Sequence, residues 1–383
     1  MIEIVEKAKC CGCAACMQIC SKHAIKMEND KTGFRYPVID QNRCVECKRC
    51  LHVCPSCNAK ERTDDIQKCY AVQNKNRREI MESSSGGVFS RLAHRTLQLG
   101  GVVIGAAFNE KFEVKHIVVE NEEEMYKIRG SKYVQSNTEN IYEIVRIYLD
   151  NKQRVLFSGT PCQINGLYGY LGKSSELLLT VDFVCHGVPS PAVWEKYKAE
   201  RFEGENIELV NFREKSNGWV DFALKMDGEK THYYKNYMQD EYMYAFMQNW
   251  DLRRSCYQCE AKGLKRKSDI TLADYWGYQG SCFSCKDWGV SMLILHTPKA
   301  IIAFEEIKTE LIYEEKNLLG ALSGNMVYYD SVPLPKKRTL FFKYLCHHSV
   351  SDTVQKLVNS KQIGRKIKMA VELFIMECFK GAE

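Results

Sequence analysis

Two runs of cysteine near the N-terminus have a spacing suited to redox or metal chemistry. Each run reads C-x2-C-x2-C-x3-C, and the second repeats the first 34 residues later, from Cys10 to Cys44. In iron–sulfur proteins with this run, the first three thiolates hold one 4Fe-4S cluster and the fourth ligates the other cluster. The predicted ligation is therefore crossed. One cluster is held by Cys10, Cys13, Cys16 and Cys54, and the other by Cys44, Cys47, Cys50 and Cys20.

The alternative to two clusters is a pair of zinc sites. Zinc prefers two separated C-x2-C pairs, and two tandem four-cysteine runs fit that pattern poorly. Residues 5–60 resemble the bacterial two-cluster ferredoxin domain, with one departure: Ser21 stands where that family usually has proline. Cys11, Cys57 and Cys69 have no place in the scheme and are interpreted as small buried or exposed residues.

Four further cysteines lie in loop-like sequence. Cys162 (SGTPCQINGL) and Cys185 (VCHGVPSP) each follow a predicted strand, and Cys256 and Cys259 form a C-x2-C pair. Strand-end loops meet at one edge of an α/β sheet, so four thiolates could hold a third cluster there. Ordinary buried cysteines are the alternative. Two further options are a nucleophilic Cys162 or Cys185 with His186 as its base, and ligation by the C-x2-C pair Cys282 and Cys285.

Three glycine-, serine- or threonine-bearing segments could cradle phosphate, although no G-x-G-x-x-G or Walker A motif occurs. Each segment alone is more often a cap or a turn. The first segment, SSSGG, precedes a predicted helix, and the third segment, SGT, ends a predicted strand. Together they are compatible with a flavin nucleotide. Their candidate residues are Ser84, Ser85, Gly86 and Gly87; Arg129, Gly130, Ser131, Lys132, Tyr133 and Ser136; and Ser158, Gly159 and Thr160.

Composition restricts the class of protein. The chain has 383 residues, 19 cysteines, 45% hydrophobic and 27% charged residues, which is typical of globular proteins and argues against disorder. A net charge of +6 is too mild for a dedicated nucleic-acid binder. Neither an 18-residue apolar run nor an apolar leader occurs, so we expect no transmembrane segment and a cytoplasmic location. Cysteine clusters in that compartment usually indicate metal binding or catalysis rather than disulfides.

The elements that must position these residues fall into three parts. Residues 1–72 are predicted to form a duplicated ferredoxin domain, and residues 339–383 a helical tail. Between them, strands such as VVIGAAF and RVLFSGT alternate with helical stretches such as NIYEIVRIYLD. This pattern predicts a mixed-sheet α/β domain over residues 76–338.

The ordered motifs SSSGGVFSRLA, GGVVIGAAF, RGSKYVQS, LFSGTPCQINGL, DFVCHGVPSP, RRSCYQC and SDITLADYWG resemble the coenzyme F420 hydrogenase/dehydrogenase beta-subunit family over about residues 75–335. The resemblance implies a flavoprotein with FAD against the SSSGG, RGSKYVQS and SGTPCQ segments. It also implies a 4Fe-4S cluster on Cys162, Cys185, Cys256 and Cys259. It does not fix the substrate, since some relatives reduce the deazaflavin coenzyme and others act on unrelated organic compounds.

These features predict an iron–sulfur flavoprotein oxidoreductase. Electrons would pass between a redox protein, the clusters, FAD and an organic acceptor, either a deazaflavin-type coenzyme or an unassigned, for example glycan-related, substrate. The main alternative is an electron-transfer subunit that serves a separate catalytic partner, and a zinc-stabilised scaffold is disfavoured. No catalytic residue is assigned, with His186, Tyr133 and Asp274 as the candidates for a general acid.

Overall fold

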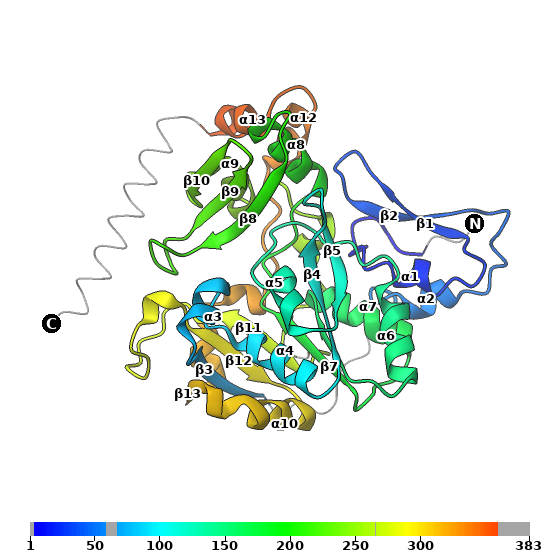
Figure 1. Cartoon of the computed structure of the whole chain (residues 1–383). Helices are drawn as coiled ribbons and strands as arrows, with labels where there is room; N and C mark the ends of the chain where they lie inside the picture. The colour runs from blue at the N-terminus through cyan, green and yellow to red at the C-terminus, as the bar shows by residue number, and fades with distance from the viewer. Residues whose placement is uncertain (1–3, 59–66, 265, 359–383) are drawn as a thin grey trace.

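The computed structural model describes residues 4–58, 67–264 and 266–358, and it places both cysteine runs in a small N-terminal lobe (Figure 1). The lobe contains an antiparallel strand pair and two short helices: β1 (Ile25–Asn29), β2 (Arg35–Ile39), α1 (Ala15–Gln18) and α2 (Arg49–Val53). Each helix carries the third cysteine of its run. Each also follows a residue with a φ of 60°, Ala14 and Lys48, so the backbone repeats with the sequence.

An eight-stranded mixed sheet forms the centre of the larger part, in the order β13-β3-β12-β11-β7-β6-β4-β5. Strands β4, β6, β7 and β11 run parallel, and the remaining pairings are antiparallel. The predicted α/β class is confirmed. The strands are β3 (Lys68–Asn74), β4 (Val102–Phe108), β5 (Val114–Val119), β6 (Val155–Ser158), β7 (Leu178–Phe183), β11 (Ile270–Asp274), β12 (Ser291–Leu295) and β13 (Leu311–Lys316).

The chain passes from the N-terminal lobe into the large sheet before residue 72, the predicted end of the ferredoxin domain. Strand β3 spans the predicted limit at residue 72, and it pairs with both β12 and β13 inside the large sheet. Its residues Ala71 and Val72 are fully buried there. The chain has therefore entered the large sheet by Lys68. The outer domain limits stay a prediction.

Helices cover the sheet, and a second, three-stranded sheet packs beside it. Strands β8 (Ile207–Glu214), β9 (Ala223–Gly228) and β10 (His232–Asn236) share an aromatic-rich core with helices α8, α9, α12 and α13. The helices are α3 (Arg77–Glu82), α4 (Val88–Gln98), α5 (Met125–Ile128), α6 (Ile141–Asp150), α7 (Pro161–Leu171), α8 (Pro191–Arg201), α9 (Glu241–Met247), α10 (Pro298–Ile307), α11 (Leu318–Leu322), α12 (Arg338–Leu345) and α13 (Val350–Leu357).

The N-terminal lobe lies against α6 and α7 (Figure 1). Two glycines on α7 allow this close approach. A Cβ at Gly166 would lie 2.8 Å from both Cβ and Sγ of Cys13, and one at Gly169 would overlap the carbonyl oxygen of Val53. Only glycine therefore fits at these two positions without displacing the lobe.

The predicted helical tail begins with α12 and α13, and residues 359–383 lie outside the described part of the chain. Within the described residues, no helix has the length and apolar character needed to cross a membrane.

Candidate iron–sulfur and flavin site

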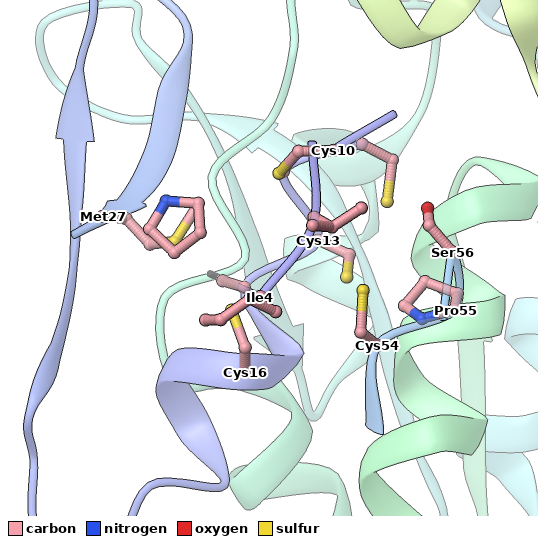
Figure 2. Close-up of a pocket in the computed structure, with 13 residues that line it drawn as sticks. Ile4, Cys10, Cys13, Cys16, Met27, Cys54, Pro55 and Ser56 are labelled. Carbon is pink, nitrogen blue, oxygen red and sulfur yellow. The ribbon is translucent and has the colours of Figure 1, made fainter. Parts of the chain in front are cut away.

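The first cysteine set, Cys10, Cys13, Cys16 and Cys54, lines one cavity (Figure 2). Three of the thiols come from the first run and the fourth from the second, which is the crossed arrangement that the spacing predicts. Each of the four residues is no more than 8% exposed. Most of the other lining residues, such as Ile4, Val5, Met27 and Pro37, are apolar. The donor set and the dry surroundings fit an iron–sulfur cluster.

Burial has a clear electrostatic effect on these thiols. It raises the pKa of Cys54 to about 12, and it also raises the pKa of Cys16, because a thiolate without water or a cation is costly. Iron coordination would reverse this preference, since a bound metal deprotonates its thiol ligands.

The second cysteine set is Cys20, Cys44, Cys47 and Cys50, and Cys20 and Cys50 pack in one side-chain cluster with Cys16 and Cys54 of the first set. Burial raises the pKa of the Cys50 thiol, and the nearby charges of Cys44 and Cys47 raise it further. Cys20 packs in the same side-chain cluster as Cys50, and its Sγ accepts a hydrogen bond from the amide of Ala24 at 3.4 Å. Cys50 therefore lies near Cys44, Cys47 and Cys20, and Cys47 is exposed to solvent.

The third cysteine set comes from three segments that are separate in the sequence: Cys162 lies in the first turn of α7, Cys185 follows β7, and Cys256 and Cys259 lie in and after a short 3-10 turn. Burial, followed by the charges of the other three cysteines, raises the pKa of Cys185. Burial likewise raises the pKa of Cys256 to about 12 and of Cys259 to about 11, and Cys162 contributes to both shifts. Such mutual effects indicate that the four sulfurs lie near one another, in residues that are half-buried.

Local sequence explains how the third set is held. Thr160 caps α7 and forms a capping box with Gln163, with Pro161 in the first turn, so Cys162 is fixed at the helix start. The Thr160 hydroxyl lies 3.2 Å from the Cys162 sulfur. On the neighbouring loop, the amide of Val188 donates to Cys256 Sγ at 3.5 Å. Among the described residues, no three His, Cys, Asp or Glu side chains have the geometry of a site for a single metal ion.

Arg253 joins the first and third cysteine sets. Its carbonyl oxygen accepts a hydrogen bond from the amide of Cys256. Its guanidinium donates to the carbonyl oxygen of Cys10 at 2.7 Å and lies 3.5 Å from Cys10 Sγ. It also donates to Gln135 Oε1 at 3.0 Å and to the carbonyl oxygen of Arg35 at 2.9 Å. The side chain is 1% exposed, so a buried cation lies between the two sets.

Cys11 and Gly166 lie at the same junction. The Cys11 thiol lies close to one thiol from each set, since Cys13 raises its pKa and Cys11 in turn raises the pKa of Cys162. Cys13 also packs on Gly166, which is four residues, or about one helical turn of 5.4 Å, from Cys162. Cys11, Arg253 and Gly166 were not predicted to lie at this junction. Only Cys11 carries a signal in the sequence, because it directly follows the predicted ligand Cys10.

The predicted flavin segments also meet one another. Ser84 Oγ and Ser131 Oγ are hydrogen-bonded at 2.7 Å, which links the first segment to the second. His116 Nε2 donates to the carbonyl oxygen of Ser158 at 3.1 Å, and its Nδ1 lies 3.0 Å from Ser136 Oγ, which links the second segment to the third. Burial lowers the pKa of His116 to about 4, so its ring is neutral and Nδ1 accepts from Ser136.

Cationic side chains surround these segments. The Lys132 ammonium donates to the carbonyl oxygens of Arg129 and Gly130 at 2.8 and 3.2 Å, and burial lowers its pKa to about 7. Burial also lowers the pKa of Lys215 to about 7, and its ammonium donates to the carbonyl oxygen of Ser85 at 3.3 Å. A lysine that has only carbonyl partners favours an anion nearby. Lys215 and His116 were not predicted, because they lie far in sequence from the motifs.

Other predicted residues have structural partners. Tyr133 Oη accepts from Arg213 at 3.3 Å, and Arg213 pairs with Asp274 at 3.1 Å. Arg129 pairs with Glu82. Gly86 packs so tightly against Ser291 and Val72 that a Cβ there would overlap the Val72 carbonyl oxygen, and Gly87, with a φ of 81°, precedes α4. His186 Nε2 lies 2.5 Å from Asn249 Oδ1. Cys282 and Cys285 lie in the loop after Tyr278 and keep no assigned role.

Comparisons with known proteins agree with this organisation. Residues 69–142 and 152–319 match the models for the N-terminal and C-terminal parts of the coenzyme F420 hydrogenase/dehydrogenase beta subunit, which together cover more than half of the chain. The chain belongs to the coenzyme F420 hydrogenase/dehydrogenase beta-subunit family. Residues 9–58 match a 4Fe-4S dicluster domain, so this family member carries an N-terminal iron–sulfur domain.

The family match places the cysteine sets in distinct modules. The dicluster match contains the first and second sets, and the C-terminal match contains the third set. No curated protein matches the chain. One solved structure that matches is a chain from the xenon-derivatized F420-reducing NiFe hydrogenase complex of Methanosarcina barkeri. It is 13% identical, has a TM-score of 0.45, and the match covers 81% of this chain and 94% of that chain.

Proposed function

We propose that this chain is an iron–sulfur flavoprotein oxidoreductase that moves electrons between a carrier protein and an organic acceptor. The first and second cysteine sets would each hold a 4Fe-4S cluster, and the third set would hold another beside FAD. Clusters exchange single electrons, and a flavin couples single-electron transfer to hydride chemistry. The observation that carries the proposal is the packing of Cys13 on α7, about one turn from Cys162, since this brings the first and third sets together.

The side chains of this chain would hold and shield the cofactors. The first set is enclosed mostly by apolar residues, and Arg253 supplies a buried positive charge next to Cys10. Hydrogen bonds and burial of this kind tune the potential of an iron–sulfur centre. The loop SGTPC ends β6, caps α7 and carries Cys162, so the same segment would contact both FAD and the third cluster.

FAD would bind along the three linked segments. Two observations support this. Helix α4 begins after Gly87 with no side-chain cap, which leaves its first amides available to an anion. Lys132 has only backbone carbonyl partners among the described residues, and a flavin phosphate would supply the missing negative charge. The contacting residues in this proposal are Ser84, Ser85, Gly86, Gly87, Arg129, Gly130, Ser131, Lys132, Tyr133, Ser136, Ser158, Gly159 and Thr160.

Anaerobic reconstitution tests the cofactor content directly. The proposal predicts about twelve iron atoms and one FAD per chain, at about four iron atoms per cluster. A Cys256→Ser/Cys259→Ser variant should retain about eight iron atoms, while a Cys57→Ser control should keep all twelve. Eight iron atoms and no flavin in the unmodified chain would contradict the proposal.

The acceptor would be a deazaflavin-type coenzyme or a glycan-related organic compound, and the reaction would take place in the cytoplasm. A second candidate function is an electron-transfer subunit that passes electrons to a separate catalytic protein. The description of the family as a beta subunit supports it. Turnover of the deazaflavin coenzyme or a nucleotide sugar by the isolated chain selects the first function. Turnover only after addition of a partner protein selects the second.

A further inference from the structure

The two cysteine sets of the N-terminal lobe differ in exposure. All four residues of the first set are buried, and Arg253 and Gly166 of the larger part cover that side of the lobe. In the second set, Cys47 is exposed, and Cys20 and Cys44 are half-buried. A redox centre on the second set would therefore be the one nearest to solvent.

The segment around the second set is rich in exposed positive charge. Arg43, Lys48 and Arg49 lie between or beside its cysteines, and Lys22 follows Cys20 in the turn that holds the Cys20 sulfur. All four are exposed, and none of them makes an ion pair with another described residue.

Two acidic residues lie in the same segment as these basic residues. Asp40 is exposed, and its carboxylate accepts the amide of Asn42 at 3.0 Å; Glu46 is exposed between Val45 and Cys47. Among these exposed charged residues, the positive side chains therefore outnumber the negative side chains. Val45 is 60% exposed and lies next to the second set, so an apolar side chain stands among these charged residues.

We propose that this surface, the basic rim of Lys22, Arg43, Lys48 and Arg49 around Val45 and Cys47, docks a small acidic electron-carrier protein. The inference rests on the proposed function. One electron leaves the carrier and one is gained at the centre held by the second set, with no proton required. Unpaired charges of one sign steer a partner of opposite charge and raise its association rate. A small apolar centre inside a polar rim suits a transient electron-transfer contact.

The test uses the reconstituted full chain and a purified acidic two-cluster ferredoxin reduced under anaerobic conditions. Stopped-flow absorbance gives the second-order rate of electron transfer at several ionic strengths. The rate should fall as salt rises. A Lys48→Glu/Arg49→Glu variant should lower the low-salt rate by about tenfold or more and flatten the salt dependence. The matched control is Lys230→Glu/Lys336→Glu. It makes the same change in net charge at exposed residues outside the lobe, and it should leave the rate within about twofold.

Reduction by dithionite separates this inference from the proposed function. Absent iron, or clusters that dithionite does not bleach, would mean that the proposed function fails. Intact clusters with equal ferredoxin rates for the unmodified chain and the Lys48→Glu/Arg49→Glu variant would overturn the docking surface alone. A variant that loses binding to vesicles of anionic phospholipid but keeps its ferredoxin rate would assign the rim to a membrane and overturn it as well.

Discussion

Replacing Arg253 by methionine removes the buried cation that joins the first and third cysteine sets while keeping an unbranched chain of similar length. Three acceptors lose their donor: the carbonyl oxygens of Cys10 and Arg35, at 2.7 and 2.9 Å, and Gln135 Oε1 at 3.0 Å. A buried acceptor left without a donor costs about 1–3 kcal/mol. Because such losses are not fully additive, we expect Arg253→Met to destabilise the chain by about 3–5 kcal/mol.

The adjacent residue provides the control. Arg254 is exposed, so Arg254→Met should change stability by less than about 0.5 kcal/mol. Anaerobic urea unfolding followed by circular dichroism compares the two variants, and iron counts report cluster retention. In addition, loss of a positive charge 3.5 Å from Cys10 Sγ should lower the reduction potential of the first cluster, as measured by redox titration with electron paramagnetic resonance. Equal unfolding midpoints and equal potentials for Arg253→Met and Arg254→Met would show that the Arg253 side chain neither stabilises the junction nor acts on the first cluster.

Three other predictions address packing, flavin binding and pH. Gly166→Ala places a Cβ 2.8 Å from Cys13, so it should lower the free energy of unfolding by about 1–3 kcal/mol and release iron from the first cluster. The control Gly320→Ala, whose nearest contact is at 3.8 Å, should do neither. Equal iron contents of the two variants would contradict this prediction. Burial lowers the pKa of Lys132 to about 7, and a bound phosphate would raise it. FAD affinity should therefore fall between pH 6.5 and 8.5 in fluorescence titrations, and a Lys132→Gln variant with the same slope would count against the site. Burial raises the pKa of Asp251 to about 7, and neither of its carboxylate oxygens has a hydrogen-bond partner among the described residues. Since the pKa of Asp251 in the folded state lies above its unfolded value, the free energy of unfolding should fall by ~2 kcal/mol from pH 5.5 to 7.5. Asp251→Asn should remove most of that fall. An unchanged dependence of the free energy of unfolding on pH in this variant would disprove the assignment to Asp251.

The cysteine runs could be interpreted from the sequence because their information is local. The spacing within a run sets which thiols share a cavity, and the gathering of Cys54 with Cys10, Cys13 and Cys16 follows the crossed pattern that the spacing predicts. The strands β6 and β7 that lead to Cys162 and Cys185 were also predicted, whereas Cys162 was expected in a loop and lies instead in the first turn of α7. The apolar runs of β6 and β7 and the TPCQ capping box are each contained within a few residues.

The junction between the sets could not be predicted in the same way. Arg253 reaches Cys10 across 243 positions of the chain, and Gly166 matters only because Cys13 packs against it. His116 and Lys215 likewise gain their roles from contacts between distant elements. Strand β3 shows the same limit, since a short apolar segment next to the ferredoxin module did not reveal that its partners are β12 and β13.

Three separate cysteine sets of this chain are proposed to hold three clusters. Anaerobic crystals of the reconstituted protein, measured on both sides of the iron absorption edge, test it most directly. We expect three four-iron densities, one bound by Cys10, Cys13, Cys16 and Cys54, one by Cys20, Cys44, Cys47 and Cys50, and one by Cys162, Cys185, Cys256 and Cys259. Single-atom peaks at these thiols, or no iron at the third set in a fully reconstituted sample, would contradict it.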